Sequence, residues 1–248
     1  MSERQPLLRD LIRSFFPDYL RLVEPDSAAQ MWLERIAFPA PKEPPEPDGD
    51  DLGDLGVVAE VTSRRGETVT VVARIEPEAL APPEIAKRLG RHLMELEVCY
   101  GQPVLTSVLY LNGGRSGIHL ESGVIGEACG IELVRIYYTI FSLAETRAEP
   151  FLDRPEPLAW AFAALMRPTK RTPEEHRRAC LERIAAAPLD EDRRLLLRQA
   201  VETFLPRPGV DLGVESRISI PGPSRSPNPR GAASAASFPC DELPLREV

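Results

Sequence analysis

Three carboxylates beside two strand-like segments are the residues of this sequence with the clearest potential for chemistry. The stretch "VVARIEPEAL", residues 71–80, ends an apolar strand pattern with Glu76 and Glu78. Two carboxylates two positions apart on a strand point to the same side, and they repel each other unless a positive charge lies close by. The pattern therefore demands a positive partner for this end of the strand.

Asp54 is the third carboxylate. It opens the strand-like run "DLGVVAEVTS" (54–63), and Glu76 closes the next one, "ETVTVVARIE" (67–76). The intervening "RRG" predicts a β-hairpin. If a three-residue turn is centred on Arg65, residues pair when their numbers sum to about 130, and Asp54 then faces Glu76. A two-residue turn shifts the register by one and separates the two carboxylates.

A divalent cation is one partner that removes the repulsion among the three carboxylates. Mg²⁺ prefers all-oxygen sites with positions open to water and phosphate. Such an ion polarises a phosphate and lowers the pKa of a bound water, which phosphodiester hydrolysis requires. Without the cation, replacing Glu76 by Gln is expected to relieve repulsion and to stabilise the protein. The alternative is that Asp54, Glu76 and Glu78 are ordinary charged residues at strand ends.

The elements around the hairpin alternate between helical and extended patterns. Helical spacing predicts helices over 6–16, 26–38 and 82–100. The near-continuous apolar run "PVLTSVLYL" (103–111) predicts a strand buried on both faces, and "IELVRIYYTIF" (131–141) predicts another strand. Three more helices are expected, the last two as an antiparallel pair: 155–166, 172–187 and 190–205. This order predicts an α/β protein with a central mixed sheet flanked by helices.

Composition indicates the limits of the folded domain and the compartment in which the protein is expected. Residues 39–51 are rich in Pro and charge and predict a solvated loop, while 207–248 are rich in Pro, Ser, Gly and Ala and predict a disordered tail. The expected domain therefore spans 1–206, with 157–206 as a helical extension. The N-terminus lacks a signal-peptide core, and no apolar run approaches about 18 residues, so we expect a cytoplasmic protein without a membrane segment.

Charge and cysteine usage narrow the function classes further. The formal net charge of −8 excludes a chain that is basic throughout, so any nucleic-acid contact needs a local basic patch. The four cysteines form no Cys-X-X-Cys motif and predict reduced thiols. The three histidines lie far apart in the sequence, which argues against a zinc site or a catalytic triad.

Three long segments carry a resemblance to a known family: "LIRSFFPDYLRLVEPDSAAQMWLERIAF", "RLGRHLMELEVCYGQPVLTSVLYLNGGRSGIHLE" and "IYYTIFSLAETRAEPFLDRPEPLAWAFAALM". They resemble the Rpn-type recombination-promoting nucleases, which are transposase-like bacterial proteins of the PD-(D/E)XK nuclease superfamily. The resemblance spans roughly residues 7–205 and rests mainly on framework segments. It implies a restriction-endonuclease-like core, namely a mixed sheet with a β-hairpin, flanked by helices.

The resemblance also implies a set of site residues. The superfamily places an Asp on one strand and a Glu-X-Lys or Glu-X-Gln on its hairpin partner. Carried over, Asp54 and Glu76 hold Mg²⁺ or Mn²⁺, and Glu78 takes the third catalytic position. Glu78 departs from the pattern because a glutamate cannot supply the positive charge that a lysine would give. Lys87 and Arg74 are two alternative candidates for that role.

The activity implied is that of a Mg²⁺-dependent DNA endonuclease, recombination-promoting and transposase-like. The stretch "KRLGRHLMELE" would form the DNA surface, with Lys87, Arg88 and Arg91 on phosphates. One alternative is that these cations are only a solvated helix face. Another is a catalytically degenerate nuclease fold that serves as a binding or interaction module, and a third is a gene product without function.

Overall fold

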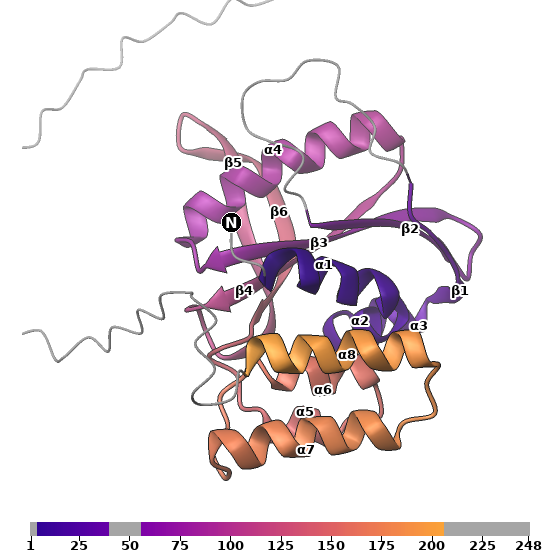
Figure 1. The fold of residues 1–248 in the computed structure, drawn as a ribbon. Coiled ribbons are helices and arrows are strands. Elements are labelled where there is room, and N and C mark those ends of the chain that lie inside the picture. Colours follow the sequence, from indigo (N-terminus) through magenta and orange to yellow (C-terminus); the bar gives the residue numbers. More distant parts are fainter. Residues whose placement is uncertain (1–3, 40–55, 206–248) are drawn as a thin grey trace, which may run out of the picture. The chain divides into compact units, whose positions relative to one another are not determined.

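Six strands form one mixed sheet in the order β1-β2-β3-β4-β6-β5. A computed structural model describes residues 4–39 and 56–205 of the chain (Figure 1). Three strands form an antiparallel meander, β4 is parallel to β3, β6 is parallel to β4, and β5 is antiparallel to β6. The strands are β1 (Met31–Ala37), β2 (Val57–Ser63), β3 (Thr68–Glu78), β4 (Val104–Asn112), β5 (Gly117–Ala128) and β6 (Ile131–Ser142).

Helices cover the two faces of the sheet unequally. Helix α4 (Pro82–Tyr100) connects β3 to β4 and crosses one face alone (Figure 1). The other face belongs to the larger core, to which residues of all remaining helices contribute. These helices are α1 (Arg4–Ser14), α2 (Phe16–Val23), α3 (Pro25–Ala29), α5 (Glu149–Leu152), α6 (Pro157–Ala163), α7 (Pro173–Ala186) and α8 (Glu191–Phe204). The prediction of an α/β protein with a mixed sheet between helices is confirmed.

Alternation along β3 decides which side chains reach which layer. Val71, Ala73 and Ile75 belong to the large core, whereas Val72 shares a small buried cluster with Leu96 of α4. Because side chains of a strand alternate between the two faces, residues 74, 76 and 78 lie on the α4 side with Val72. The polar end of β3 is therefore placed beneath, or just beyond, the first turns of α4.

The β2–β3 hairpin has the register that a three-residue turn predicts. Paired residues have numbers that sum to 130, from Val57 with Ala73 to Thr62 with Thr68. The predicted helix 82–100 and the doubly buried strand 103–111 are confirmed as α4 and β4. The predicted antiparallel pair 172–187 and 190–205 is confirmed as α7 and α8, which lie side by side (Figure 1).

Two segments differ from their predictions. The helix predicted over 26–38 is wrong, because α3 ends at Ala29 and Met31–Ala37 forms the edge strand β1. Pairing with β2 satisfies the backbone of this segment and buries Met31, so tertiary context overrides a helical spacing that is only a few residues long. Strand β5 was not predicted, since Gly123 and Gly126 interrupt its apolar pattern.

Several predictions fall outside the described residues. They concern Asp54, most of the Pro-rich stretch 39–51, and the tail 207–248. Within the ranges that are described, Cys99, Cys129 and Cys180 do not form disulfides. None of the helices in those same ranges is long and apolar enough to cross a membrane.

Candidate functional site

A buried polar cluster lies where β3 ends beneath α4. Its members are Arg74 and Glu76 of β3 and His92 of α4, all of which are buried. Arg88 of α4 joins the cluster from the solvent side, with its side chain 40% exposed. Burying three polar side chains at one strand end is costly unless each finds a partner, so their contacts decide what the site can do.

Arg74 is the closest positive partner of Glu76. Its Nε donates to Glu76 Oε1 across 2.5 Å, and both side chains are less than a tenth exposed. A carboxylate removed from water in this way is maintained as an ion only by a nearby positive charge. The positive partner that the carboxylate pattern demands is thus present in the same strand, two residues before Glu76.

Arg88 holds the same carboxylate more loosely. Its Nη1 lies 3.3 Å from both oxygens of Glu76, while its Nη2 lies 3.8 Å from Glu84 Oε1 on the preceding turn of α4. These distances exceed the 2.7–2.9 Å typical of charge-assisted hydrogen bonds. Glu76 therefore has one tight, buried guanidinium and one loose, partly exposed guanidinium.

His92, at the back of the cluster, accepts a hydrogen bond from Arg74. Arg74 Nη1 lies 2.9 Å from His92 Nδ1. Arginine has no acceptor atom, so the Nδ1 of His92 must carry a lone pair and the ring proton must be on Nε2. Arg74 is accordingly fixed at two of its nitrogens, which gives Glu76 a partner with little freedom to move.

Tyr110 lies beside Glu76 on the neighbouring strand. The two residues are paired across β3 and β4, and Tyr110 belongs to the small core beneath α4. Burial raises the pKa of Tyr110 to about 12, and the charge of Glu76 contributes in the same direction. The phenol therefore stays protonated even well above neutral pH and can donate a hydrogen bond at the edge of the cluster.

Glu78 has a different environment from Glu76. It is exposed, and its Oε1 accepts a hydrogen bond of 3.2 Å from Asn112 Nδ2 at the end of β4. The Asn112 amide also donates to the carbonyl of Pro77. Glu78 thus remains on the solvent side of the strand end, where its carboxylate is accessible to a ligand.

The predicted site residues are only partly brought together. Glu76 and Glu78 share a strand face as predicted, and among the described residues Glu76 contacts Arg74 and Arg88. Within residues 4–39 and 56–205, no group of three or more His, Cys, Asp or Glu side chains is arranged to hold a metal. Since Asp54 lies outside these ranges, the three-carboxylate site stays a prediction.

The predicted DNA-contacting residues of α4 fall into two kinds. Lys87 and Arg91 are exposed on the outer side of the helix, which leaves them accessible to a large partner. Arg88 instead turns toward the end of β3 and contacts Glu76. Sequence reasoning missed this contact, although Arg88 lies only six residues after the start of α4 at Pro82, within the first two turns of the helix.

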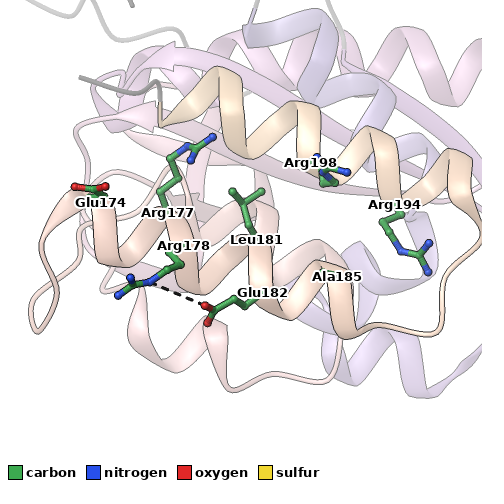
Figure 2. Close-up of a pocket in the computed structure, with 8 residues that line it drawn as sticks. All are labelled: Glu174, Arg177, Arg178, Leu181, Glu182, Ala185, Arg194 and Arg198. Atoms are coloured by element: carbon green, nitrogen blue, oxygen red, sulfur yellow. Dashed lines mark ion pairs between the residues drawn. The ribbon is translucent and has the colours of Figure 1, made fainter. Parts of the chain in front are cut away.

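A second candidate is the cleft between α7 and α8, of about 810 Å³. Figure 2 shows Arg177 and Leu181 rising from α7 toward α8, with Arg178 paired to Glu182. The cleft is lined by Glu174, Arg177, Arg178, Leu181, Glu182, Ala185, Arg194 and Arg198.

Ion pairs and hydrogen bonds in this cleft join the two helices at one point and bind the turn between them. Arg177 pairs with Glu202 of α8 at 3.4 Å, and Arg194 donates to the Leu189 carbonyl at 2.8 Å and to Glu191 at 2.7 Å. These contacts fix the α7–α8 turn. The cluster at the end of β3 is therefore the better candidate site. Its carboxylate, Glu76, is buried, and it contacts Arg88, which is partly exposed to solvent.

No family model matches the chain, and no curated protein or solved structure shows a significant match to it.

Proposed function

We propose that this protein is a Mg²⁺-dependent DNA endonuclease with a restriction-endonuclease-like core, of the recombination-promoting, transposase-like kind. The observation that carries the proposal is Glu76, a buried carboxylate near the end of the second hairpin strand, with two guanidiniums around it. The mixed sheet and the β2–β3 hairpin support the same proposal, because the superfamily pattern places its Asp and its Glu on the two strands of such a hairpin.

The oxygen donors proposed for the metal are those of Asp54 and Glu76, with Glu78 as a third ligand or as the group that orients water. Carboxylate oxygens suit a hard divalent cation such as Mg²⁺ or Mn²⁺. When bound, that cation would polarise the phosphate and activate a water molecule. The exposed position of Glu78, with one oxygen held by Asn112, is compatible with either role.

Arg74 is proposed to take the place of the lysine that the superfamily pattern carries two residues after the glutamate. It supplies positive charge from two residues before Glu76, on the same face of β3. Its second contact, with His92, orients it toward the strand end. A fixed guanidinium near the reacting phosphate would stabilise the negative charge that develops during hydrolysis.

Arg88 is proposed to exchange partners when DNA binds. Its long contacts to Glu76 and its partial exposure make it the more easily displaced of the two arginines. A DNA phosphate offers it a stronger bidentate partner, and its departure frees a Glu76 oxygen. Lys87 and Arg91, exposed on the same helix, would add phosphate contacts.

One observation favours the alternative, a catalytically degenerate nuclease fold that binds without cleaving. Arg74 and Arg88 already neutralise Glu76, so this carboxylate does not need a metal to be stable in the fold. Position 78 also lacks the usual lysine or glutamine. In this alternative the ion pairs at the end of β3 are structural, and only the α4 surface is functional.

Plasmid nicking by the full chain in Mg²⁺, in Mn²⁺ and in EDTA separates the two proposals. We expect nicking with either metal, loss in EDTA, and loss in Glu76→Gln. The matched control is Glu97→Gln, which changes an exposed glutamate of α4 on the helix turn far from Glu76. A parent protein that binds plasmid without any metal-dependent nicking supports the degenerate fold instead.

A further inference from the structure

The carboxyl ends of three strands lie together at the edge of the sheet that holds Glu76. Strands β3, β4 and β6 are parallel, and their register aligns Glu76 with Tyr110 and Tyr110 with Ser142. Ligands of open α/β sheets bind outside the carboxyl ends of the strands, where the loops that follow them supply further contacts. The loop after β4, residues 113–116, leaves the sheet at this edge, one strand away from Glu76.

This loop folds over the same face of the sheet as Glu76. Residues that pair across neighbouring strands share a face, so Glu76, Tyr110 and Ser142 all point toward the α4 side. Gly114 contacts the last two, because a Cβ added to it would overlap Ser142 Oγ and would lie 3.1 Å from Tyr110 Cδ2. Since adjacent strands are about 4.8 Å apart, Gly114 lies roughly 5–10 Å to the side of Glu76.

Both ends of the loop are bound to strand ends. Asn112 Nδ2 donates to Glu78 Oε1 at 3.2 Å, and Ser116 forms a β-bridge with Ser142. Between them Gly114 has a φ of 86°, in the left-handed region that favours glycine. The position of the loop is thus fixed by contacts at both ends and by a glycine that allows the close approach.

Arg115 is the charged residue that this loop presents. It is exposed, and among the described residues it has no hydrogen-bond, ion-pair or cation–π partner. Arg74 and Arg88 differ from it, because their guanidiniums already contact Glu76. A guanidinium without an acceptor inside the fold is available to bind a phosphate through two parallel hydrogen bonds.

We propose that Arg115 is a DNA-binding residue of the candidate site, where it binds a backbone phosphate next to the one that lies at Glu76. The DNA strand would then be held at two places along this edge, by the cations of α4 and by the loop after β4. This role rests on the proposed function, because it presupposes that DNA crosses the carboxyl ends of these strands.

DNA binding in EDTA tests the contact without requiring cleavage. Fluorescence anisotropy with a labelled duplex at several salt concentrations gives the affinity of the full chain and its salt dependence. We expect Arg115→Gln to weaken binding to all duplex sequences alike and to make the negative slope of log K against log salt concentration shallower by about 0.9. The matched control is Arg183→Gln, which changes an exposed arginine of α7 paired with Asp153 and should leave both quantities unchanged. Circular dichroism melts check that each variant is folded.

Plasmid nicking in Mn²⁺ separates substrate binding from a structural role of Arg115. A contact made equally to the bound substrate and to the transition state raises KM and leaves kcat unchanged, so we expect this pattern for Arg115→Gln and partial recovery for Arg115→Lys. Equal affinity and equal salt slope for the parent and Arg115→Gln would overturn the role of Arg115 and leave the proposed nuclease intact. A parent that does not bind DNA would overturn the proposed function and this role together.

Discussion

Arg74 and Glu76 form a buried ion pair along one face of β3, with Nε 2.5 Å from Oε1. Two carboxylates at a strand end repel each other unless a positive charge lies close by. In this protein Arg74 supplies that charge for Glu76. The pair also reverses one expectation from the sequence: removing the charge of Glu76 does not relieve repulsion but leaves Arg74 buried without its counter-ion.

Glu76→Gln is accordingly expected to lower the free energy of unfolding in EDTA. Removing one partner of a buried ion pair typically costs about 3–5 kcal/mol, because the remaining charge is left desolvated. Urea denaturation of the parent and the variant measures the difference. Glu78→Gln is the control, since it changes an exposed carboxylate, and we expect a change within about 0.5 kcal/mol. Equal stability of the parent and Glu76→Gln would contradict the ion-pair interpretation.

The two arginines should differ in what their removal costs. Arg74→Gln leaves a buried carboxylate with only a loose partner, so we expect a loss of stability of the same order as for Glu76→Gln. Arg88 is partly exposed and its contacts are long, so Arg88→Gln is expected to cost about 1 kcal/mol or less. Urea denaturation of both variants measures the two losses of stability. If Arg88 is the main partner of Glu76, Arg88→Gln costs more than Arg74→Gln.

Arg88→Gln should also strengthen the response to Mn²⁺ if the proposed metal role of Glu76 is correct. The variant removes the guanidinium that competes for the carboxylate oxygens. A ligand at a hundredfold excess over its dissociation constant stabilises a fold by about 2.7 kcal/mol, so a tighter site raises the melting temperature at a lower metal concentration. Differential scanning calorimetry over a Mn²⁺ titration measures this. No metal-dependent shift in either protein would favour the degenerate fold.

Lys87 and Arg91 are expected to contribute to DNA affinity through phosphates. Each phosphate contact removed makes the negative slope of log K against log salt concentration shallower by about 0.9. The double variant Lys87→Ala with Arg91→Ala should therefore make it shallower by about 2. Fluorescence anisotropy with a labelled duplex at several salt concentrations gives the slope. The control replaces Arg178 and Arg183 of α7 with Ala. An unchanged slope in the α4 variant would assign Lys87 and Arg91 to the solvated surface.

Glu149 is expected to make the free energy of unfolding depend on pH in the acid range. Burial alone would raise its pKa, but hydrogen bonds from the backbone N–H groups of Thr169 and Lys170 lower it to about 2. A carboxyl with a lowered pKa stabilises the fold above its unfolded value of 4.5, and this contribution is lost as the pH falls toward about 2. Glu149→Gln should therefore show a shallower loss of stability over this window in urea titrations. Parallel curves for the two proteins would show that the contact is not formed.

Gly123 of β5 lies so close to α4 that it accepts no side chain. A Cβ added there would lie within van der Waals overlap of the Cβ of Ala86. Gly123→Ala is therefore expected to cost about 1–3 kcal/mol by overpacking. Adding Ala86→Gly should recover part of the loss, less about 1 kcal/mol for a glycine in a helix. Thermal denaturation of the two single variants and the double variant measures the coupling, and simple additivity would contradict the close contact.

Elements whose signals are local could be predicted from the amino-acid sequence. The length of the turn around Arg65 decides the register of β2 with β3, so the pairing of Val57 with Ala73 follows from a few adjacent residues. Helix α4 follows from apolar residues at helical spacing after a proline start, and β4 follows from its apolar run. The strand face shared by Glu76 and Glu78 also follows from the two-residue repeat of a strand.

The remaining features depend on contacts between segments that are distant in the sequence. Met31–Ala37 has a pattern too short to exclude a helix, and it becomes a strand because β2 offers an edge with which it can pair. Arg88 reaches Glu76, 12 residues earlier in the chain, only because α4 crosses back over the end of β3. The partner of a buried charge depends on how two elements pack, and periodicity within either element contains no information about that packing.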